Sequence, residues 1–250
     1  MKSCYMTDSG KVRSHNEDSV TILKNASDEY LLVVADGIGG HRKGEVASSI
    51  AVSRLGKRFN DTPSIGTKLD AVNWLNDNIN EINKEILEYG ETNTDSKGLG
   101  TTVVVALLTK NYLIFGNIGD SSGYVIKNNK LHKVTKAHTL VNLLVEAGNI
   151  TPEEAKTHPK KNILMKALGV SEKCELDIFD VDMTIDGILL CSDGLTNMLT
   201  SDQIEKVLCE EELSIEEKVS KLIRKCNARG GTDNISIAYL TINEGSNGKW

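Results

Sequence analysis

Residues 33–45, VVADGIGGHRKGE, join an apolar run to a glycine-rich turn through one carboxylate, that of Asp36. The run over residues 31–35 has no polar side chain, which predicts a buried strand. Four of the eight residues after Asp36 are glycine, so few side chains surround that carboxylate. Asp-Gly is a common pair in turns, and a turn alone would explain a single stretch of this kind.

The same pattern recurs further along the chain. LLCSDGL (189–195) ends another apolar run at Asp193, and FGNIGDSS (115–122) repeats the pattern more loosely. Each instance alone is explained by a turn or a helix cap, but their succession along one chain is not. The acids at expected element ends are Glu17, Asp18, Asp36, Asp120, Asp193 and Asp233.

These acids indicate a metal site. Asp36 and Asp193 follow runs too apolar for a surface, so we expect both carboxylates at the edge of the core. Anions gathered in a low dielectric repel one another, and protonating them requires pKa shifts of several units. A divalent cation removes this cost. Oxygen ligands without His or Cys favour Mg²⁺ or Mn²⁺, and the glycines let carbonyls and waters approach.

Composition excludes several classes of protein. The net charge of −6 argues against nucleic acid as a partner, and no apolar stretch approaches the roughly 20 residues that span a membrane. The first residues lack the apolar core of a signal peptide. Five cysteines without a CxxC pair indicate reduced thiols, so we expect a cytoplasmic protein. We expect one domain over residues 1–243 and a flexible tail over 244–250.

Hydrophobic periodicity predicts clustered strands with helices between the clusters, which is typical of antiparallel sheets flanked by helices. Capping boxes in TPEEA (151–155), TSDQ (200–203) and SIEE (214–217) predict three helix starts. The turn at 36–40 lacks the spacing of a nucleotide-binding loop. Strands are expected at 20–23, 30–35, 101–108, 112–116, 122–126, near 131, 187–192 and 235–242, and helices at 45–59, at 67–89 with Gly90 as C-cap, and over 138–168.

Six stretches follow one another along the chain: TDSGKVRSHNEDS (7–19), LLVVADGIGGHRKGEVAS (31–48), GLGTTVVVALL (98–108), NIGDSSGYVI (117–126), LLCSDGLTNML (189–199) and GGTDNISI (230–237). In these stretches and their order, nearly the whole chain resembles the PPM family of metal-dependent protein serine/threonine phosphatases (the PP2C type), especially its bacterial members. The resemblance implies an α+β fold, a four-layer α-β-β-α sandwich of two central antiparallel β-sheets flanked by helices.

The resemblance also implies metal ligands. Asp36 would bridge two Mn²⁺ or Mg²⁺ ions, and the Gly37 carbonyl would bind one of them. Asp193 and Asp233 would complete the second ion's shell, and Asp120 would help to hold a third, weaker ion.

Glu17 or Asp18 would bind a metal directly or through water, and Arg13 would bind the substrate phosphate. A hydroxide bridging the two metals would attack phosphorus directly, with no covalent phosphoenzyme. The rigid fork of an arginine suits the phosphate role. The residues expected to carry catalysis are Arg13, Asp36, Asp193 and Asp233.

Three positions depart from the family pattern. Ile38 stands where animal members have a histidine and bacterial members commonly a methionine, and Ser122 replaces the usual arginine after GDS. Ala137 stands where bacterial members usually carry an acid, which puts the geometry near the flap (residues 136–168) in question. None of the three belongs to the expected two-metal core.

The histidines nearest these motifs have ordinary explanations. A lone histidine at a helix start more often caps or packs than contacts substrate, and we interpret His138 in this way. His15 and His41 border the expected site, and we interpret both as solvated surface residues.

The leading hypothesis is therefore an Mn²⁺- or Mg²⁺-dependent phosphoprotein phosphatase, a monomer acting on the substrates of a cognate Ser/Thr kinase and on the kinase itself. One alternative is a non-catalytic regulatory or phospho-binding module on the same fold, although inactive relatives usually lack one of the acids. Another is a metal phosphodiesterase or small-molecule phosphatase on a different scaffold.

Overall fold

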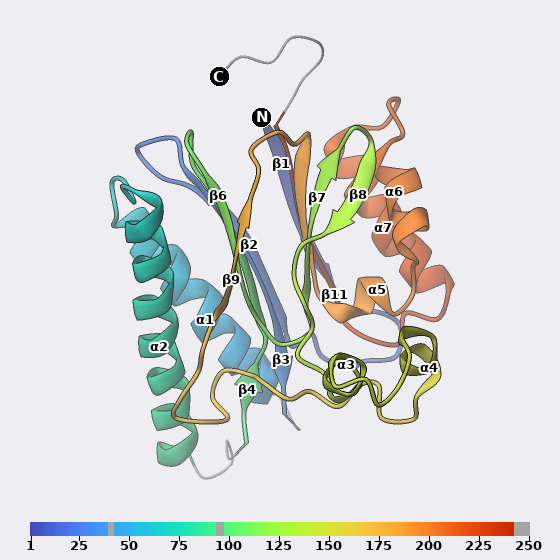
Figure 1. Cartoon of the computed structure of the whole chain (residues 1–250), viewed down its shortest axis with the longest axis horizontal. Coiled ribbons are helices and arrows are strands. Elements are labelled where there is room, and N and C mark those ends of the chain that lie inside the picture. Colours follow the sequence, from blue (N-terminus) through green and yellow to red (C-terminus); the bar gives the residue numbers. More distant parts are fainter. Residues whose placement is uncertain (40–42, 94–97, 243–250) are drawn as a thin grey trace.

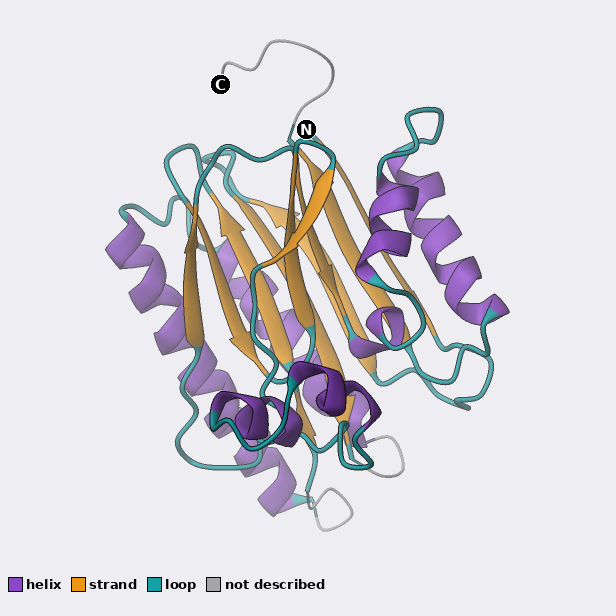
Figure 2. Cartoon of the chain, turned by 45° about the vertical axis from the view of Figure 1, so that its right-hand side comes forward, coloured by secondary structure: helices purple, strands orange, loops and turns teal. Residues whose placement is uncertain are grey.

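The computed structural model describes residues 1–39, 43–93 and 98–242, and it places them in four layers (Figure 1). Two antiparallel sheets stack at the centre, with helices on both outer faces (Figures 1 and 2). This arrangement confirms the predicted α+β sandwich. The predicted tail, 244–250, and His41 lie outside the described residues. Within the described ranges, no helix is long and apolar enough to cross a membrane.

The first sheet has the strand order β1-β11-β10-β7-β8, and the second β2-β3-β5-β6-β9, with β4 paired to β3. The first sheet contains β1 (Lys2–Asp8), β7 (Ser122–Lys127), β8 (Lys130–Lys133), β10 (Gly187–Cys191) and β11 (Ile235–Thr241). The second contains β2 (Asp18–Lys24), β3 (Tyr30–Ile38), β4 (Gly100–Thr101), β5 (Val103–Leu108), β6 (Leu113–Ile118) and β9 (Asp177–Val181).

Strand β3 explains why the apolar run before Asp36 is continuous. Leu31 and Val33 pack into the cluster beneath α1 and α2, whereas Leu32 and Val34 pack between the two sheets. Successive side chains of a strand point to opposite faces, so a strand buried on both faces needs apolar residues at every position. Asp36 follows where this double burial ends.

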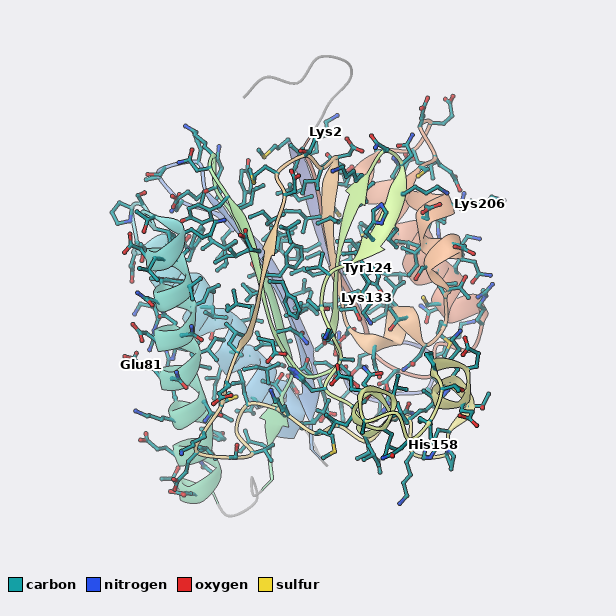
Figure 3. All side chains as sticks on the ribbon, in the orientation of Figure 1. Lys2, Glu81, Tyr124, Lys133, His158 and Lys206 are labelled. Atoms are coloured by element: carbon teal, nitrogen blue, oxygen red, sulfur yellow. The ribbon has the colours of Figure 1, made fainter. Side chains whose placement is uncertain are left out.

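The helices cover the sheets and one end of the sandwich. Helices α1 (Lys43–Asn60) and α2 (Lys68–Thr92) cover the second sheet, while α6 (Ser201–Leu208) and α7 (Ile215–Ala228) cover the first. Charged side chains such as Glu81 and Lys206 point outward from these layers (Figure 3). The short helices α3 (Leu140–Glu146), α4 (Pro152–Thr157) and α5 (Asp193–Thr196) lie toward one end (Figure 1).

The three predicted capping boxes are confirmed at Thr151, Thr200 and Ser214. Gly90 as a C-cap was wrong: α2 continues to Thr92, and Asn93 caps it by donating its N–H to the Tyr89 carbonyl. The helical prediction for 138–168 was wrong over most of its length, since only α3 and α4 are helical there.

Candidate active site

A pocket of about 480 Å³ opens where the loops at one end of the two sheets meet. Its walls come from the β1–β2 loop, the end of β3, the β6–β7 loop, the start of α5, the residues before β11, and the flap. The lining contains Arg13, Glu17, Asp36, Gly37, Asp120, Asp193 and Asp233, together with Lys161, Asn162 and Leu164 of the flap. The fold thus gathers all but one of the predicted site residues in one pocket.

The exception is Asp18, which does not line this pocket. It pairs with Asp36 across the β2–β3 ladder and is only 7% exposed. Its Oδ2 accepts a hydrogen bond of 2.7 Å from the Ser192 hydroxyl, and its Oδ1 has no hydrogen-bond partner. Of the two adjacent acids, Glu17 therefore faces the pocket and Asp18 stands behind it.

Backbone contacts fix Asp36 near the end of β3, two residues before Ile38. Its N–H donates to the Thr102 hydroxyl (3.0 Å), and its carbonyl accepts from the Thr102 N–H (2.8 Å). The next residue must be glycine, because a Cβ on Gly37 would lie 2.2 Å from the Gly44 carbonyl oxygen. The paired hydrogen bonds with Thr102 and the close packing of Gly37 against Gly44 thus hold the Asp36 carboxylate at the pocket.

Asp193 begins α5 directly after β10. Its Oδ2 accepts a hydrogen bond of 2.9 Å from the Asn197 side chain, and its Oδ1 has no hydrogen-bond partner. Gly194 follows and packs against the backbone before β11, since a Cβ there would lie 1.9 Å from the Asn234 carbonyl oxygen. The Asp193 and Asp233 segments are therefore locked together.

Burial and mutual repulsion strain the carboxylates in their charged form. Burial raises the pKa of Asp36 well above its ordinary value, and the charges of Asp18 and Asp193 raise it further. Burial raises the pKa of Asp193 to about 7, with Asp120 and Asp233 adding to the effect. Burial likewise raises the pKa of Asp18 to about 6. The pocket therefore holds more negative charge than the protein alone stabilises at neutral pH.

These residues fit a divalent cation. Two buried carboxylate oxygens, Asp18 Oδ1 and Asp193 Oδ1, have no hydrogen-bond partner. A hard cation would supply the positive charge needed to offset the negative charge of these carboxylates. The donors are all oxygens, which suits Mg²⁺ or Mn²⁺. Among the described residues, no three acidic, histidine or cysteine side chains form a preassembled cluster. The acids that would hold an ion line the pocket from separate segments.

Arg13 provides positive charge in the same pocket. Its Nη2 donates a hydrogen bond of 2.9 Å to Asp233 Oδ2, and this bond raises the pKa of the guanidinium. The Arg13 side chain is 51% exposed, so it remains accessible to a ligand. The Arg13 guanidinium thus lies in the same pocket as the acids. This arrangement suits an anionic ligand that contacts both the guanidinium and metal ions held by the acids.

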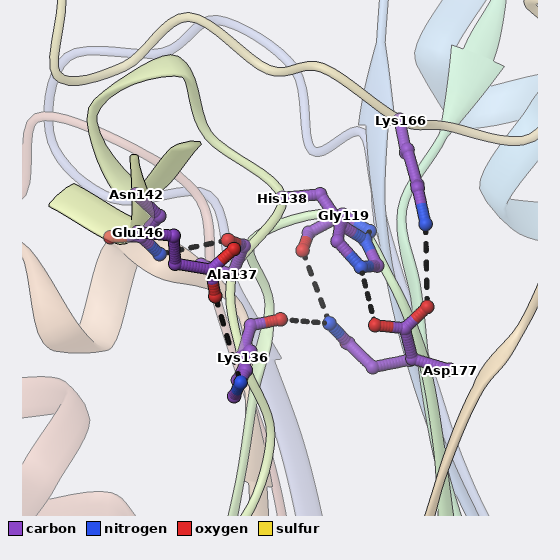
Figure 4. A network of polar contacts seen from close by, with 9 residues as sticks. Gly119, Lys136, Ala137, His138, Asn142, Glu146, Lys166 and Asp177 are labelled. Carbon is purple, nitrogen blue, oxygen red and sulfur yellow. Dashed lines mark hydrogen bonds and ion pairs between the residues drawn. The ribbon is translucent and has the colours of Figure 1, made fainter. Parts of the chain in front are cut away.

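The sequence did not reveal the polar network behind the Asp120 loop (Figure 4). His138 Nδ1 accepts a hydrogen bond of 2.9 Å from the Gly119 N–H, and its Nε2 lies 3.0 Å from Asp177 Oδ2. Lys166 Nζ lies 3.3 Å from the other oxygen of Asp177. His138 does not line the pocket, as expected, but Thr139 rather than His138 caps α3.

The three positions that depart from the family pattern lie in the pocket wall, in a buried strand and at the root of the flap. Ile38 forms part of the pocket wall, and Ser122 is buried at the start of β7. The Ala137 carbonyl accepts a hydrogen bond of 2.8 Å from the Asn142 side chain at the root of the flap. His15 is exposed, as expected.

Comparisons of the sequence and of the structure with known proteins both identify protein phosphatases as relatives of this chain. The family model described as protein phosphatase 2C matches residues 10–233. The serine/threonine phosphatase stp of Listeria welshimeri is 42% identical over 244 residues, which are 97% of this chain and 96% of that protein. Protein phosphatase PhpP of Streptococcus pneumoniae is 36% identical over 245 residues, 98% of each chain.

Solved structures agree with these matches. The serine/threonine phosphatase of S. agalactiae superimposes with a TM-score of 0.91 at 35% identity, covering 97% of this chain and 99% of that one. Stp1 from Staphylococcus aureus gives 0.90 at 36% identity, covering 97% of this chain and 95% of that one. The chain therefore belongs to the protein phosphatase 2C family of serine/threonine phosphatases.

Proposed function

We propose that this enzyme hydrolyses phosphoserine and phosphothreonine in proteins by direct attack of a hydroxide that bridges bound Mn²⁺ or Mg²⁺ ions. The observation that carries this proposal is the pocket itself, where Glu17, Asp36, Asp120, Asp193 and Asp233 meet one arginine. Family membership implies metal-dependent catalysis in general.

In this proposal Asp36, the Gly37 carbonyl, Asp193 and Asp233 would hold the two core ions. Asp120 helps to hold a third ion. Glu17 binds a metal directly or through water, because it faces the pocket, while Asp18 supports Asp36 from behind. When bound, such ions supply hydroxide near neutral pH, because coordination lowers the pKa of water by many units.

The protein's own groups bind and orient the substrate. The Arg13 guanidinium, directed into the pocket by Asp233, is placed to form paired hydrogen bonds with two phosphoryl oxygens. Asn197 holds the Asp193 carboxylate in one orientation, and Thr102 holds the Asp36 backbone. Ile38, Leu164 and Met198 form an apolar part of the wall, against which the side chain of a phosphorylated residue can pack.

The substrates we infer are phosphorylated proteins, including those of a cognate Ser/Thr kinase and the kinase itself. The named relatives, which are serine/threonine and protein phosphatases, support this inference. We further infer a monomer with a single catalytic domain over residues 1–243. The five cysteines, all free thiols, suit the cytoplasm.

The non-catalytic module remains the alternative, and the complete acidic set argues against it. The alternative that required another scaffold does not fit the observed fold. The test is hydrolysis of a phosphothreonine peptide by chelator-treated protein before and after Mn²⁺ is added, with Asp36→Ala as the inactive variant. Turnover that requires Mn²⁺ and is absent in the variant supports the proposal. Turnover indifferent to chelator, or none at any Mn²⁺ concentration, overturns it.

A further inference from the structure

The β1–β2 loop, residues 9–17, contains no helix or strand and yet carries both Arg13 and Glu17. Contacts with other segments, among them the segment before β11, therefore fix its place. The N–H groups of Lys11 and Val12 both donate to the Gly231 carbonyl, at 2.8 and 3.2 Å. These contacts hold the first half of the loop only.

One buried side chain contacts the loop at three further points, while the Glu17 carbonyl also accepts hydrogen bonds from the Gly37 N–H (3.1 Å) and the Ser48 hydroxyl (2.6 Å). Asn234 is 6% exposed, and its Nδ2 donates to the carbonyls of Ser9 (3.0 Å) and His15 (2.9 Å). Its Oδ1 accepts a hydrogen bond of 2.9 Å from the Glu17 N–H. The beginning, the second half and the end of the loop thus meet at one amide.

The Asn234 backbone also contacts the segments that carry Asp233 and Asp193. The Asn234 N–H donates to Asp233 Oδ1 (2.9 Å), while Arg13 Nη2 donates to Asp233 Oδ2 (2.9 Å). The Asn234 carbonyl lies directly against Gly194, beside Asp193. Asn234 therefore links the loop that carries the arginine to the segments that carry two of the acids.

We propose that Asn234 is a positioning residue that fixes Arg13 and Glu17 relative to Asp233 and Asp193, an inference that rests on the proposed phosphatase function. An amide suits this task because it offers two N–H donors and a carbonyl acceptor in one plane. An aspartate would keep the acceptor but lose both donors. A serine is too short to reach three backbone groups.

Asn83 offers a matched control. It is fully buried on α2, its Nδ2 donates to the Ser171 carbonyl (2.9 Å), and its Oδ1 accepts from the Gly169 N–H (2.8 Å). It does not line the active-site pocket. Asn83→Ala and Asn234→Ala therefore remove similar hydrogen bonds from buried amides, and both should lower the melting temperature.

Only Asn234→Ala should change the kinetics. We expect kcat/KM for a phosphothreonine peptide to fall about 100-fold, the cost of a small misplacement of catalytic groups. Inhibition by inorganic phosphate, to which Arg13 contributes in the proposed site, should weaken by about tenfold. Asn234→Ser, which leaves a hydroxyl in the space, is the milder variant if Asn234→Ala does not fold, with Asn83→Ser as its control.

Hydrogen–deuterium exchange of residues 9–17 gives a readout independent of activity. Exchange there should accelerate in the Asn234 variant and stay unchanged in the Asn83 variant. The proposal is overturned if the two variants lose only stability, or if exchange over 9–17 does not change. A wild-type protein without turnover would defeat the proposed function, while the exchange experiment would still decide whether Asn234 holds the loop.

Discussion

Replacing Asp193 by asparagine should stabilise the metal-free protein while abolishing its activity. Asp193 is buried, its pKa is raised to about 7, and Asp120, Asp233 and Asp18 add their charges to the cost of ionising it. Asparagine is nearly isosteric and keeps an acceptor for the Asn197 side chain. The change thus removes a charge without opening a cavity.

The size and the pH dependence of this effect follow from the pKa. Its value of about 7 compares with an ordinary 3.8, and each unit corresponds to about 1.4 kcal/mol. Ionised Asp193 therefore lowers the free energy of unfolding by on the order of 4 kcal/mol. We expect Asp193→Asn to raise it by about 2–4 kcal/mol, because the neighbouring acids titrate together with Asp193 and the effects are not additive. Between pH 3.8 and about 7 the folded state binds more protons than the unfolded state, so this cost grows as pH rises and is complete above about 7.

Urea unfolding in the presence of chelator measures the free energy of unfolding at about pH 5 and about pH 8. The variant should exceed wild type most at pH 8, and the difference should shrink at pH 5. Saturating Mn²⁺ should reverse the order, because only wild type binds it tightly. Asp77→Asn, at an exposed acid on α2, is the control and should change little. A variant no more stable than wild type at pH 8 would refute the reasoning.

Three further substitutions test other parts of the site. Arg13→Lys keeps the positive charge but loses the paired donors of the guanidinium, so kcat/KM for a phosphopeptide should fall about 10–100-fold with Mn²⁺ binding unchanged. An equal loss of Mn²⁺ affinity would contradict the phosphate-binding role of Arg13. Asp120→Ala should leave two tightly bound Mn²⁺ ions by calorimetry but lower kcat, and unchanged kinetics would remove Asp120 from the site. Gly194→Ala places a Cβ 1.9 Å from a carbonyl oxygen and should lower the urea-derived free energy of unfolding by about 3 kcal/mol or more, whereas wild-type stability would show that the Asn234 segment can move aside.

The sequence predicted most of the fold because buried strands need apolar residues at every position. Two strands escaped prediction for a physical reason. The half-exposed edge strand β1 pairs with residues 235–241, more than two hundred positions away, and β9 is short and lacks a buried face. The flap was predicted as helical, with the capping box at Thr151 as its clearest signal, but only the short helices α3 and α4 form there.

The acids of the site were predictable because each directly follows or precedes a strand that the pattern revealed. The groups that hold them were not. Asn234 acts through backbone atoms at positions 9, 15 and 17, and His138 acts through Gly119 and Asp177. Such contacts join residues far apart in the chain, and an asparagine or a histidine alone gives no signal of them.

Calorimetric titration of the chelator-treated protein with Mn²⁺ at pH 7, in two buffers of different ionisation enthalpy, reports both the ions bound and the protons released. We expect at least two ions per chain with net proton release, because carboxyls such as that of Asp193 are partly protonated before metal binds. Binding of no ion, or of a single ion without proton release, would contradict the inference that these crowded acids form a metal centre.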